Sequence, residues 1–331
     1  MREVIGNQQA RDLLVRAALG GAVSHAYLLT GPDQIGKTTL ALAFARLLQC
    51  TARAPDDPEP CGACLACRKI AHGTHPDVRV LEPPEGKQWL PVEQVRDLLH
   101  TAYLAPYEGR WRIFILPQVE RMRAESANAL LKTLEEPPPG VMLLLTSGAP
   151  DLLLPTVISR CQVVPLAPLA PEEVARALVE RWGAAPDDAR TLAGLASGRL
   201  GWAVEALAQP ERRDRRETLL RQIVELAGAS RDARMRLASQ LASDTEAARG
   251  AVELWALWWR DALLAAHGAG DLASTGAARA AAEQIGRAVG PVRAEVFMRR
   301  LLETRQQLDQ NANPRLALEV LALEMPSGGP R

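Results

Sequence analysis

Residues 31–38, GPDQIGKT, have the spacing of a P-loop, the backbone motif that cradles nucleotide phosphates. Its glycines permit a tight turn whose N–H groups point inward. Its lysine would neutralise the β- and γ-phosphates, and its first threonine offers a hydroxyl to Mg²⁺. An apolar run at residues 26–30 precedes the motif and a helical pattern follows it, as a P-loop requires. The candidate nucleotide-binding residues are Gly31, Gly36, Lys37, Thr38 and Thr39. They predict a site for ATP or ADP with Mg²⁺.

Four cysteines form a second candidate site, with two residues between each of the last three. They are Cys50, Cys61, Cys64 and Cys67. Four thiolates at this spacing suit tetrahedral Zn²⁺, and an iron–sulfur cluster is the weaker alternative because nothing else indicates redox chemistry. Four protein ligands leave no open coordination position, so we expect a structural site. His72 and His75 are interpreted as spare histidines in a turn, and Cys161 as a buried small residue.

The groups that would drive hydrolysis are missing from the end of the strand expected at residues 112–116, RIFIL. P-loop ATPases place a carboxylate that holds Mg²⁺ there, and usually an acid that orients water. Pro117 and Gln118 occupy these positions, and Glu120 lies farther along the chain. Proline cannot ligate a metal, and glutamine is not a general base. We therefore expect a pocket that binds nucleotide and hydrolyses it poorly, or a loop retained mainly for structure.

The order of the expected elements indicates the scaffold that positions these residues. Strands are expected at residues 26–30, 78–81, 112–116 and 141–146, and helices at residues 8–20, from 36, at 92–99 and at 124–134. Strands that alternate with helices predict a parallel sheet covered by helices on both faces. A proline-rich stretch at 165–171 is typical of a linker, and the chain is helical in pattern from residue 172. A second boundary is expected near residues 209–210.

Composition limits the classes of function. Lys plus Arg and Asp plus Glu each number 39, which argues against nucleic-acid binding by bulk charge but allows a local basic face. The first residues have no apolar leader, and the sequence holds no run of about 18 apolar residues. We therefore expect neither a signal peptide nor a membrane span, and a cytoplasmic protein.

One helical segment, residues 251–266, is rich in tryptophan. Its apolar face, at helical spacing, comprises Val252, Trp255, Trp259 and Leu263, widened by Leu254 and Trp258. The core of a helical bundle is the simpler interpretation of this face, and a subunit interface is the alternative.

Four further motifs accompany the P-loop and the cysteines. They are GTHPDV at 73–78, NALLKTLEEPP at 128–138, SRC at 159–161 and NPRLALE at 313–319. In this order and spacing the chain resembles the bacterial clamp-loader subunits, AAA+ proteins of the DNA polymerase III holoenzyme. The resemblance is strongest over residues 4–170. It implies an α/β AAA+ P-loop domain with a zinc-binding insertion (1–166), a small helical lid domain (167–209) and an all-α oligomerisation, or collar, domain (210–331).

The resemblance covers two types of subunit. In the tau/gamma motor type, the strand after the zinc module ends in Asp-Glu, and a lid helix begins with a sensor arginine. Here Pro117 and Gln118 replace the two acids, and Gly201 of the segment GRLG (198–201) stands where that arginine is expected. These departures resemble the delta-prime stator type, which implies weak or absent ATP hydrolysis by this chain. A hydrolysing motor subunit is the alternative.

The same resemblance implies roles for three other motif residues. Arg160 would be an arginine finger that stabilises the γ-phosphate in a neighbouring motor subunit. Lys132 could face DNA phosphates or be an ordinary solvated lysine, and Glu135 and Glu136 are interpreted as structural or interfacial. The implied partners are tau/gamma and delta subunits in a pentameric loader, the sliding clamp, and primed DNA through the assembled complex. No membrane partner is expected.

Overall fold

The structure is a computed structural model that describes residues 1–82, 90–122, 124–242, 245–270, 278–309 and 312–326. The chain divides into two compact units, Met1–Leu169 and Ala170–Arg331. The finer division into three domains stays a prediction.

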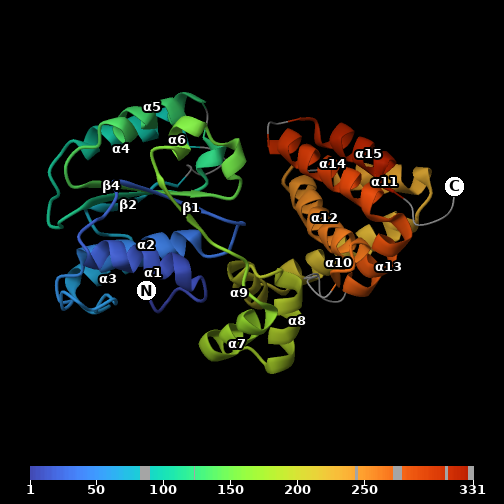
Figure 1. Cartoon of the computed structure of the whole chain (residues 1–331), viewed down its shortest axis with the longest axis horizontal. Helices are drawn as coiled ribbons and strands as arrows, with labels where there is room; N and C mark the ends of the chain where they lie inside the picture. Colours follow the sequence, from blue (N-terminus) through green and yellow to red (C-terminus); the bar gives the residue numbers. More distant parts are fainter. Residues whose placement is uncertain (83–89, 123, 243–244, 271–277, 310–311, 327–331) are drawn as a thin grey trace. The chain divides into compact units, whose positions relative to one another are not determined.

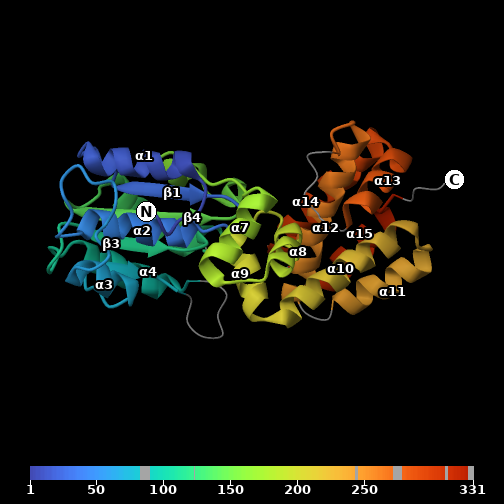
Figure 2. The ribbon, with the colours of Figure 1, turned by 90° about the horizontal axis from the view of Figure 1, so that it is seen from below.

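The first unit is built on a five-stranded sheet with the order β2-β3-β4-β1-β5. Its strands are β1 (Ala26–Thr30), β2 (Val78–Val80), β3 (Arg112–Leu116), β4 (Val141–Ser147) and β5 (Gln162–Pro165). Every paired strand runs parallel to its neighbour. Helices lie on both faces of the sheet, as Figures 1 and 2 show. The predicted parallel sheet with two helical layers is therefore confirmed.

One helix of the first unit precedes β1, and the others occupy the connections between strands. They are α1 (Gln8–Leu19), α2 (Lys37–Gln49), α3 (Leu65–Ala71), α4 (Val92–Ala102), α5 (Ala124–Glu135) and α6 (Pro155–Ile158), with short 3₁₀ turns at η1 (Val119–Arg121) and η2 (Pro150–Leu152). The sequence did not predict five elements of this unit, which are α3, α6, β5 and the two 3₁₀ turns η1 and η2. The short helix α3 lies inside the cysteine module, and β5 immediately precedes the stretch interpreted as a linker. Its sequence, QVVP, is too short and too polar at its start to stand out as a strand.

Two hydrophobic cores lie on opposite faces of this sheet. Side chains alternate between the faces along each strand. In β1, Tyr27 and Leu29 pack into the core beneath α1 and α2, whereas Leu28 packs into the core beneath α4 and α5. All five residues of β1 are buried, because a parallel sheet is covered on both faces. This burial fixes the position of the loop that follows Thr30.

Among the described residues of the second unit, all regular secondary structure is helical. Its helices are α7 (Pro171–Trp182), α8 (Pro186–Ala196), α9 (Leu200–Ala208), α10 (Pro210–Gly228), α11 (Arg231–Leu241), α12 (Thr245–Ala266), α13 (Arg279–Val289), α14 (Pro291–Asp309) and α15 (Pro314–Glu324). Trp255, Trp258 and Trp259 of α12 are fully buried, and Trp259 packs edge-on against Phe297 of α14. The core interpretation of the tryptophan-rich face is therefore confirmed.

Among the described residues, no helix is both long enough and apolar enough to cross a membrane.

Candidate nucleotide-binding and metal sites

The P-loop connects the carboxyl end of β1 to the first turn of α2. Gly31 has a φ of 141° and Gly36 a φ of 105°, values that side chains with a Cβ rarely adopt. Gly31 is also pressed against the backbone, since a Cβ there would lie 2.5 Å from the carbonyl oxygen of Leu166. The two glycines are therefore required by the conformation of the loop. Predicted strand, loop and helix occur in the expected order.

Lys37 is buried, and its ammonium group turns back over the loop. Its Nζ lies 2.6 Å from the carbonyl oxygen of Gly31, 2.9 Å from that of Pro32 and 3.3 Å from Oδ1 of Asp33. Thr38 is half-buried and Thr39 is exposed. A buried ammonium at the mouth of a loop with two left-handed glycines is the donor set of a phosphate cradle, so these residues fit a bound nucleotide phosphate.

The segment after β3 lies beside the P-loop because the sheet places β3, β4 and β1 next to one another. Gln118 has a left-handed backbone, with a φ of 50°, and its N–H donates to Oγ1 of Thr146 at 3.2 Å. Its side-chain Nε2 lies 3.5 Å from Oδ2 of Asp33. Gln118 therefore lies next to the phosphate cradle, as expected for a residue that follows this strand.

Glu120 lies beyond the positions where the sequence spacing places the acids of an ATPase, yet it approaches the same site. It lies in the 3₁₀ turn η1, which folds it back so that Oε1 accepts the backbone N–H of Gly148 at 2.8 Å. Its Oε2 is buried and has no hydrogen-bond partner within the part of the chain that the structure describes. A Cβ at Gly148 would lie 2.8 Å from the Asp33 carboxylate and 3.3 Å from that of Glu120. Two carboxylates thus converge beside the P-loop, and only the tightness of the turn after β3 could have indicated this.

The four cysteines of the predicted metal site converge, with all four Sγ atoms within 4.8 Å of one another. The Sγ atoms of Cys50 and Cys64 are 3.9 Å apart. A tetrahedral ion with Zn–S bonds of about 2.3 Å requires sulfur–sulfur separations of about 3.8 Å. The arrangement of the thiols therefore fits a four-coordinate metal ion.

Backbone N–H groups support the sulfur atoms as thiolates. The N–H of Cys61 donates to Cys50 Sγ at 3.3 Å, and the N–H of Cys64 donates to Cys61 Sγ at 3.3 Å. The N–H of Cys67 donates to Cys64 Sγ at 3.5 Å, from the first turn of α3. Burial raises the pKa of Cys64, but N–H donors from Cys67 and Thr51 outweigh it and lower that pKa to about 5. The low pKa of Cys64 favours metal binding by this residue, because the thiolate is the ligand, whereas burial raises the pKa values of Cys50 and Cys67.

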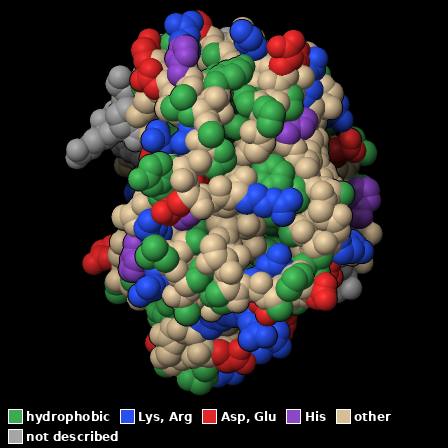
Figure 3. Space-filling model, turned by 90° about the vertical axis from the view of Figure 1, so that its left-hand side faces the viewer, with side chains coloured by type: hydrophobic (Ala, Val, Ile, Leu, Met, Phe, Trp, Pro, Cys, Tyr) green, Lys and Arg blue, Asp and Glu red, His purple; other side chains and the backbone are tan. Residues whose placement is uncertain are grey.

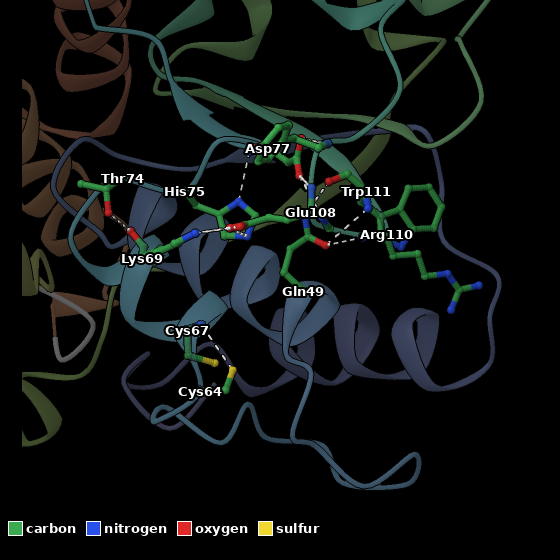
Figure 4. A network of polar contacts seen from close by, with 12 residues as sticks. Gln49, Cys64, Cys67, Lys69, Thr74, His75, Asp77, Glu108, Arg110 and Trp111 are labelled. Atoms are coloured by element: carbon green, nitrogen blue, oxygen red, sulfur yellow. Dashed lines mark hydrogen bonds and ion pairs between the residues drawn. The ribbon is translucent and has the colours of Figure 1, made fainter.

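Neither histidine near the cysteines belongs to this cluster, as we expected. His72 is exposed, whereas His75 is buried and its Nδ1 accepts the backbone N–H of Asp77 at 3.1 Å. Nδ1 is then unprotonated, and the opposite ring nitrogen lies 3.6 Å from Glu108. Figure 4 shows His75 between Asp77 and the ion pair of Lys69 with Glu108, away from Cys64 and Cys67. His75 is thus part of a packed polar network rather than a spare surface histidine.

Asp77 of the GTHPDV motif anchors the loop that leads into β3. Its fully buried carboxylate accepts the N–H groups of Tyr107, Glu108 and Gly109 at 2.7, 2.9 and 2.8 Å. Burial raises the pKa of Asp77, but these donors, together with Arg112, outweigh it and lower the pKa below its usual value. The motif therefore fixes the entry to β3, the strand that Gln118 follows.

Gln49, the last residue of α2, fixes the same loop from the other side. Its Oε1 accepts the N–H groups of Arg110 and Trp111, at 3.0 and 3.3 Å, and its Nε2 donates to the Trp111 carbonyl at 2.5 Å (Figure 4). The P-loop helix and the strand that follows the metal module are thereby tied together.

Arg160 follows α6 at the edge of the first unit and is about one third exposed. Its guanidinium pairs with Glu135 of α5 at 2.7 Å and donates to the carbonyl oxygen of Thr156 at 2.9 Å. Glu135 was interpreted as structural or interfacial, and the structure shows that it contacts Arg160. Cys161 is half-buried against the core below α4 and α5, and burial raises its pKa to about 12. It is therefore an unreactive packing residue.

The segment Gly198–Gly201 enters α9 in the second unit. Arg199 is buried and its guanidinium lies 2.5 Å from Glu253 of α12, inside that unit. Arg216 of α10 lies over the ring of Trp202 of α9, with its guanidinium carbon 4.6 Å from the ring centroid. Arg199 is thus held by an internal partner and does not replace the arginine that is absent at Gly201.

Lys132 is exposed on α5. On the face of the molecule in Figure 3, basic and acidic side chains are interspersed with hydrophobic ones and gather in no single basic patch. An isolated lysine contributes little to binding a phosphate backbone. A contact between Lys132 and DNA stays a prediction.

Family comparisons match both units of the chain. The family model for the DNA polymerase III delta subunit matches residues 6–170, and the model for the C-terminal part of that subunit matches residues 210–326. The two matched segments flank the region of α7, α8 and α9.

Individual relatives match about half of the chain. The delta-prime subunit of DNA polymerase III from Pseudomonas aeruginosa is 43% identical over 182 residues, which are 53% of this chain and 55% of that protein. The tau subunit from Escherichia coli is 35% identical over 172 residues, which are 52% of this chain and 26% of that protein. A solved gamma-subunit-related protein from Thermotoga maritima is 15% identical, with 95% of this chain and 98% of that one covered and a TM-score of 0.44. The chain spans about half the length of the delta-prime relative that it matches.

Proposed function

Because the chain belongs to the DNA polymerase III delta-subunit family, we propose that it is a clamp-loader subunit of the delta-prime, or stator, type. In this role it supports the loading of a sliding clamp onto primed DNA. It contributes Arg160 to ATP bound by a neighbouring subunit and hydrolyses ATP poorly or not at all itself.

The observation that carries this proposal is the identity of the residues after β3. Pro117 and Gln118 stand where a P-loop ATPase needs the acid that holds Mg²⁺ and the acid that orients water. The Gln118 amide lies next to Asp33 of the P-loop, so an amide stands beside the phosphate cradle where an ATPase would have a carboxylate. The residues Gly31, Gly36, Lys37, Thr38 and Thr39 would then hold ATP or ADP with Mg²⁺. Bound Mg²⁺ would supply charge neutralisation of the phosphates.

A hydrolysing tau/gamma-type motor subunit is the second candidate, and one observation favours it. Glu120 returns to the P-loop side of the sheet and keeps a buried carboxylate oxygen free of hydrogen bonds from the described residues. Its other oxygen is held by the N–H of Gly148. A carboxylate fixed in this way lacks the freedom to replace both acids of a motor site, so we favour the stator.

Arg160 has the exposure and charge that an arginine finger needs. A guanidinium brought to a γ-phosphate stabilises the charge that develops in phosphoryl transfer, which is worth about 10³–10⁵ in rate. Its partner Glu135 is half exposed, so the ion pair is weak and can be exchanged for a phosphate.

The four cysteines would hold Zn²⁺ as a structural ion. Cys50, Cys61, Cys64 and Cys67 fill the four positions of a tetrahedral site, so the ion has no position for a substrate. The module is linked to α2 through Cys50, directly after the residue that fixes the loop before β3. Zinc would therefore stabilise the scaffold of the nucleotide site.

The wider assembly is proposed on the same basis. The partners are tau/gamma and delta subunits in a pentameric loader, with the clamp and primed DNA bound by the complex. Residues 1–166 act as the AAA+ domain, 167–209 as the lid and 210–331 as the collar. We expect this complex to work in the cytoplasm, where a bacterial chromosome lies.

ATP turnover separates the two candidates. The purified chain alone should show no turnover above that of Lys37→Ala, and robust hydrolysis that this substitution and Glu120→Gln abolish would establish the motor type instead. In a loader reconstituted with tau/gamma and delta subunits, Arg160→Ala should lower the ATPase rate at least about twofold, because one interface of the ring loses its finger. Assembly should be intact, and the exposed Arg176→Ala serves as the matched control. An unchanged rate removes the finger assignment.

A further inference from the structure

Asp33 is the acidic residue of the P-loop, and its carboxylate connects the loop to the segment after β3. Oδ1 lies 3.3 Å from Nζ of Lys37. Oδ2 lies 3.5 Å from Nε2 of Gln118 and 3.8 Å from the guanidinium of Arg121. Gln118 is 85 residues away in sequence. The carboxylate therefore spans the mouth of the phosphate cradle rather than pointing into solvent.

Lys37 has no spare hydrogen-bond donor in this arrangement. A lysine ammonium has three N–H donors, and the Gly31 carbonyl, the Pro32 carbonyl and the Asp33 carboxylate are three acceptors. A phosphate oxygen that pairs with Lys37 must replace one of them. The two carbonyls belong to the loop backbone, whereas the Asp33 side chain is 38% exposed and can turn away. Asp33 is thus the acceptor that a phosphate would displace.

Displacement does not remove the negative charge of Asp33 from the site. The carboxylates of Asp33 and Glu120 both approach Gly148, and Arg121 is a partly exposed counter-charge at 3.8 Å. Phosphate groups held by Lys37 would therefore lie beside a carboxylate. Like charges at such separations repel, and a triphosphate carries more charge than a diphosphate.

We propose that Asp33 is a specificity-determining residue of the P-loop, which competes with nucleotide phosphates for Lys37 and disfavours ATP more than ADP. The effect is largest without a divalent cation, because Mg²⁺ neutralises part of the phosphate charge. This inference rests on the proposed nucleotide binding. In this proposal, Asp33 controls nucleotide affinity, and the missing acids after β3 do not.

Titration calorimetry with ATP and with ADP, in buffer without Mg²⁺ or chelator, tests the inference on the full zinc-loaded chain. Asp33→Asn removes the charge and keeps the size of the side chain. Asp97→Asn, on an exposed position of α4, is the matched control for the loss of one negative charge. We expect Asp33→Asn to tighten ATP binding by about three- to tenfold at low salt, for charges about 3–6 Å apart at an effective dielectric constant of about 80. ADP binding should tighten less, and Asp97→Asn should change neither. The gain should shrink between about 0.02 M and about 0.3 M salt, because screening weakens exposed charges.

Each outcome separates this inference from the function on which it rests. If the wild type and Asp33→Asn bind ATP equally, the inference fails and the proposed nucleotide site stands. If neither binds ATP, with or without Mg²⁺, both fail, since removing the charge has not opened the cradle. If Asp33→Asn weakens ATP binding when Mg²⁺ is added, the carboxylate acts as a metal ligand and the inference is overturned. Melting temperatures within a few degrees of one another show that the variants compared are folded.

Discussion

Replacing Asp77 with asparagine should destabilise the first unit by about 2–4 kcal/mol. In the wild type, Oδ2 accepts the N–H groups of Glu108 and Gly109, and Oδ1 accepts that of Tyr107 and faces Arg112 at 3.6 Å. An asparagine has a single oxygen, so its best orientation serves the two donors at Oδ2 and turns an NH₂ group toward the other two. Each buried donor that loses its acceptor costs about 1–3 kcal/mol, and the two bonds that remain lose their charge.

Urea denaturation of the full zinc-loaded chain, together with amide hydrogen exchange of residues 107–112, measures this effect. Unfolding of the first unit should shift to lower urea, and the amides of Tyr107, Glu108 and Gly109 should exchange faster. Asp97→Asn, which removes the same charge from an exposed position, is the control and should stay within about 0.5 kcal/mol of the wild type. A loss below about 1 kcal/mol, or unchanged exchange at these amides, would refute the role given to the buried carboxylate.

The pH dependence gives a second, independent test of the same residue. The pKa of Asp77 is lower in the folded chain than its ordinary value of 3.8. Stability from a depressed carboxyl pKa is present in full above the unfolded value and is lost as pH falls through the folded one. The stability difference between wild type and Asp77→Asn should therefore be constant near neutral pH and decline below about pH 4. A difference that grows on acidification contradicts this account.

Three other perturbations test separate parts of the molecule. Cys61→Ser should reduce bound zinc below about one ion per chain and destabilise the first unit, because three thiolates remain; metal analysis that finds full zinc retention rules out the four-thiolate site. Gly286→Ala should destabilise the second unit by about 1–3 kcal/mol, since a Cβ there would lie 2.0 Å from a backbone oxygen of α12. Gly250→Ala is the control: its Cβ would meet nothing within 4 Å, so this variant should be neutral or more stable by up to about 1 kcal/mol. Tryptophan fluorescence in urea measures the unfolding of both variants. Equal shifts of their urea midpoints would contradict the packing explanation. Glu135→Gln should change the ATPase rate of the reconstituted loader by at most about fivefold, because a half-exposed ion pair is worth at most about 1 kcal/mol. A loss well above about fivefold would show that Glu135 acts directly.

The sequence by itself determined the features whose chemistry lies in local spacing. The P-loop could be identified because its glycines, lysine and threonine act within eight neighbouring residues. The four cysteines could be grouped because a metal ion selects the residue types and brings short spacings together. The buried strands at residues 26–30 and 112–116 were evident because a strand covered on both faces is apolar throughout.

Only the tertiary structure decided which distant side chains meet. Asp33 reaches Gln118, Glu120 reaches Gly148 and Glu135 reaches Arg160 because of the strand order and one 3₁₀ turn, which no local pattern encodes. The strand β5 likewise depends on its pairing with β1, because its own sequence is short and partly polar. The sequence favoured a core for the tryptophans of α12 and left a subunit interface as the alternative, and the packing of α13 and α14 against α12 decided for the core. Periodicity shows which face of an element is apolar, whereas the partner of that face is set by long-range contacts.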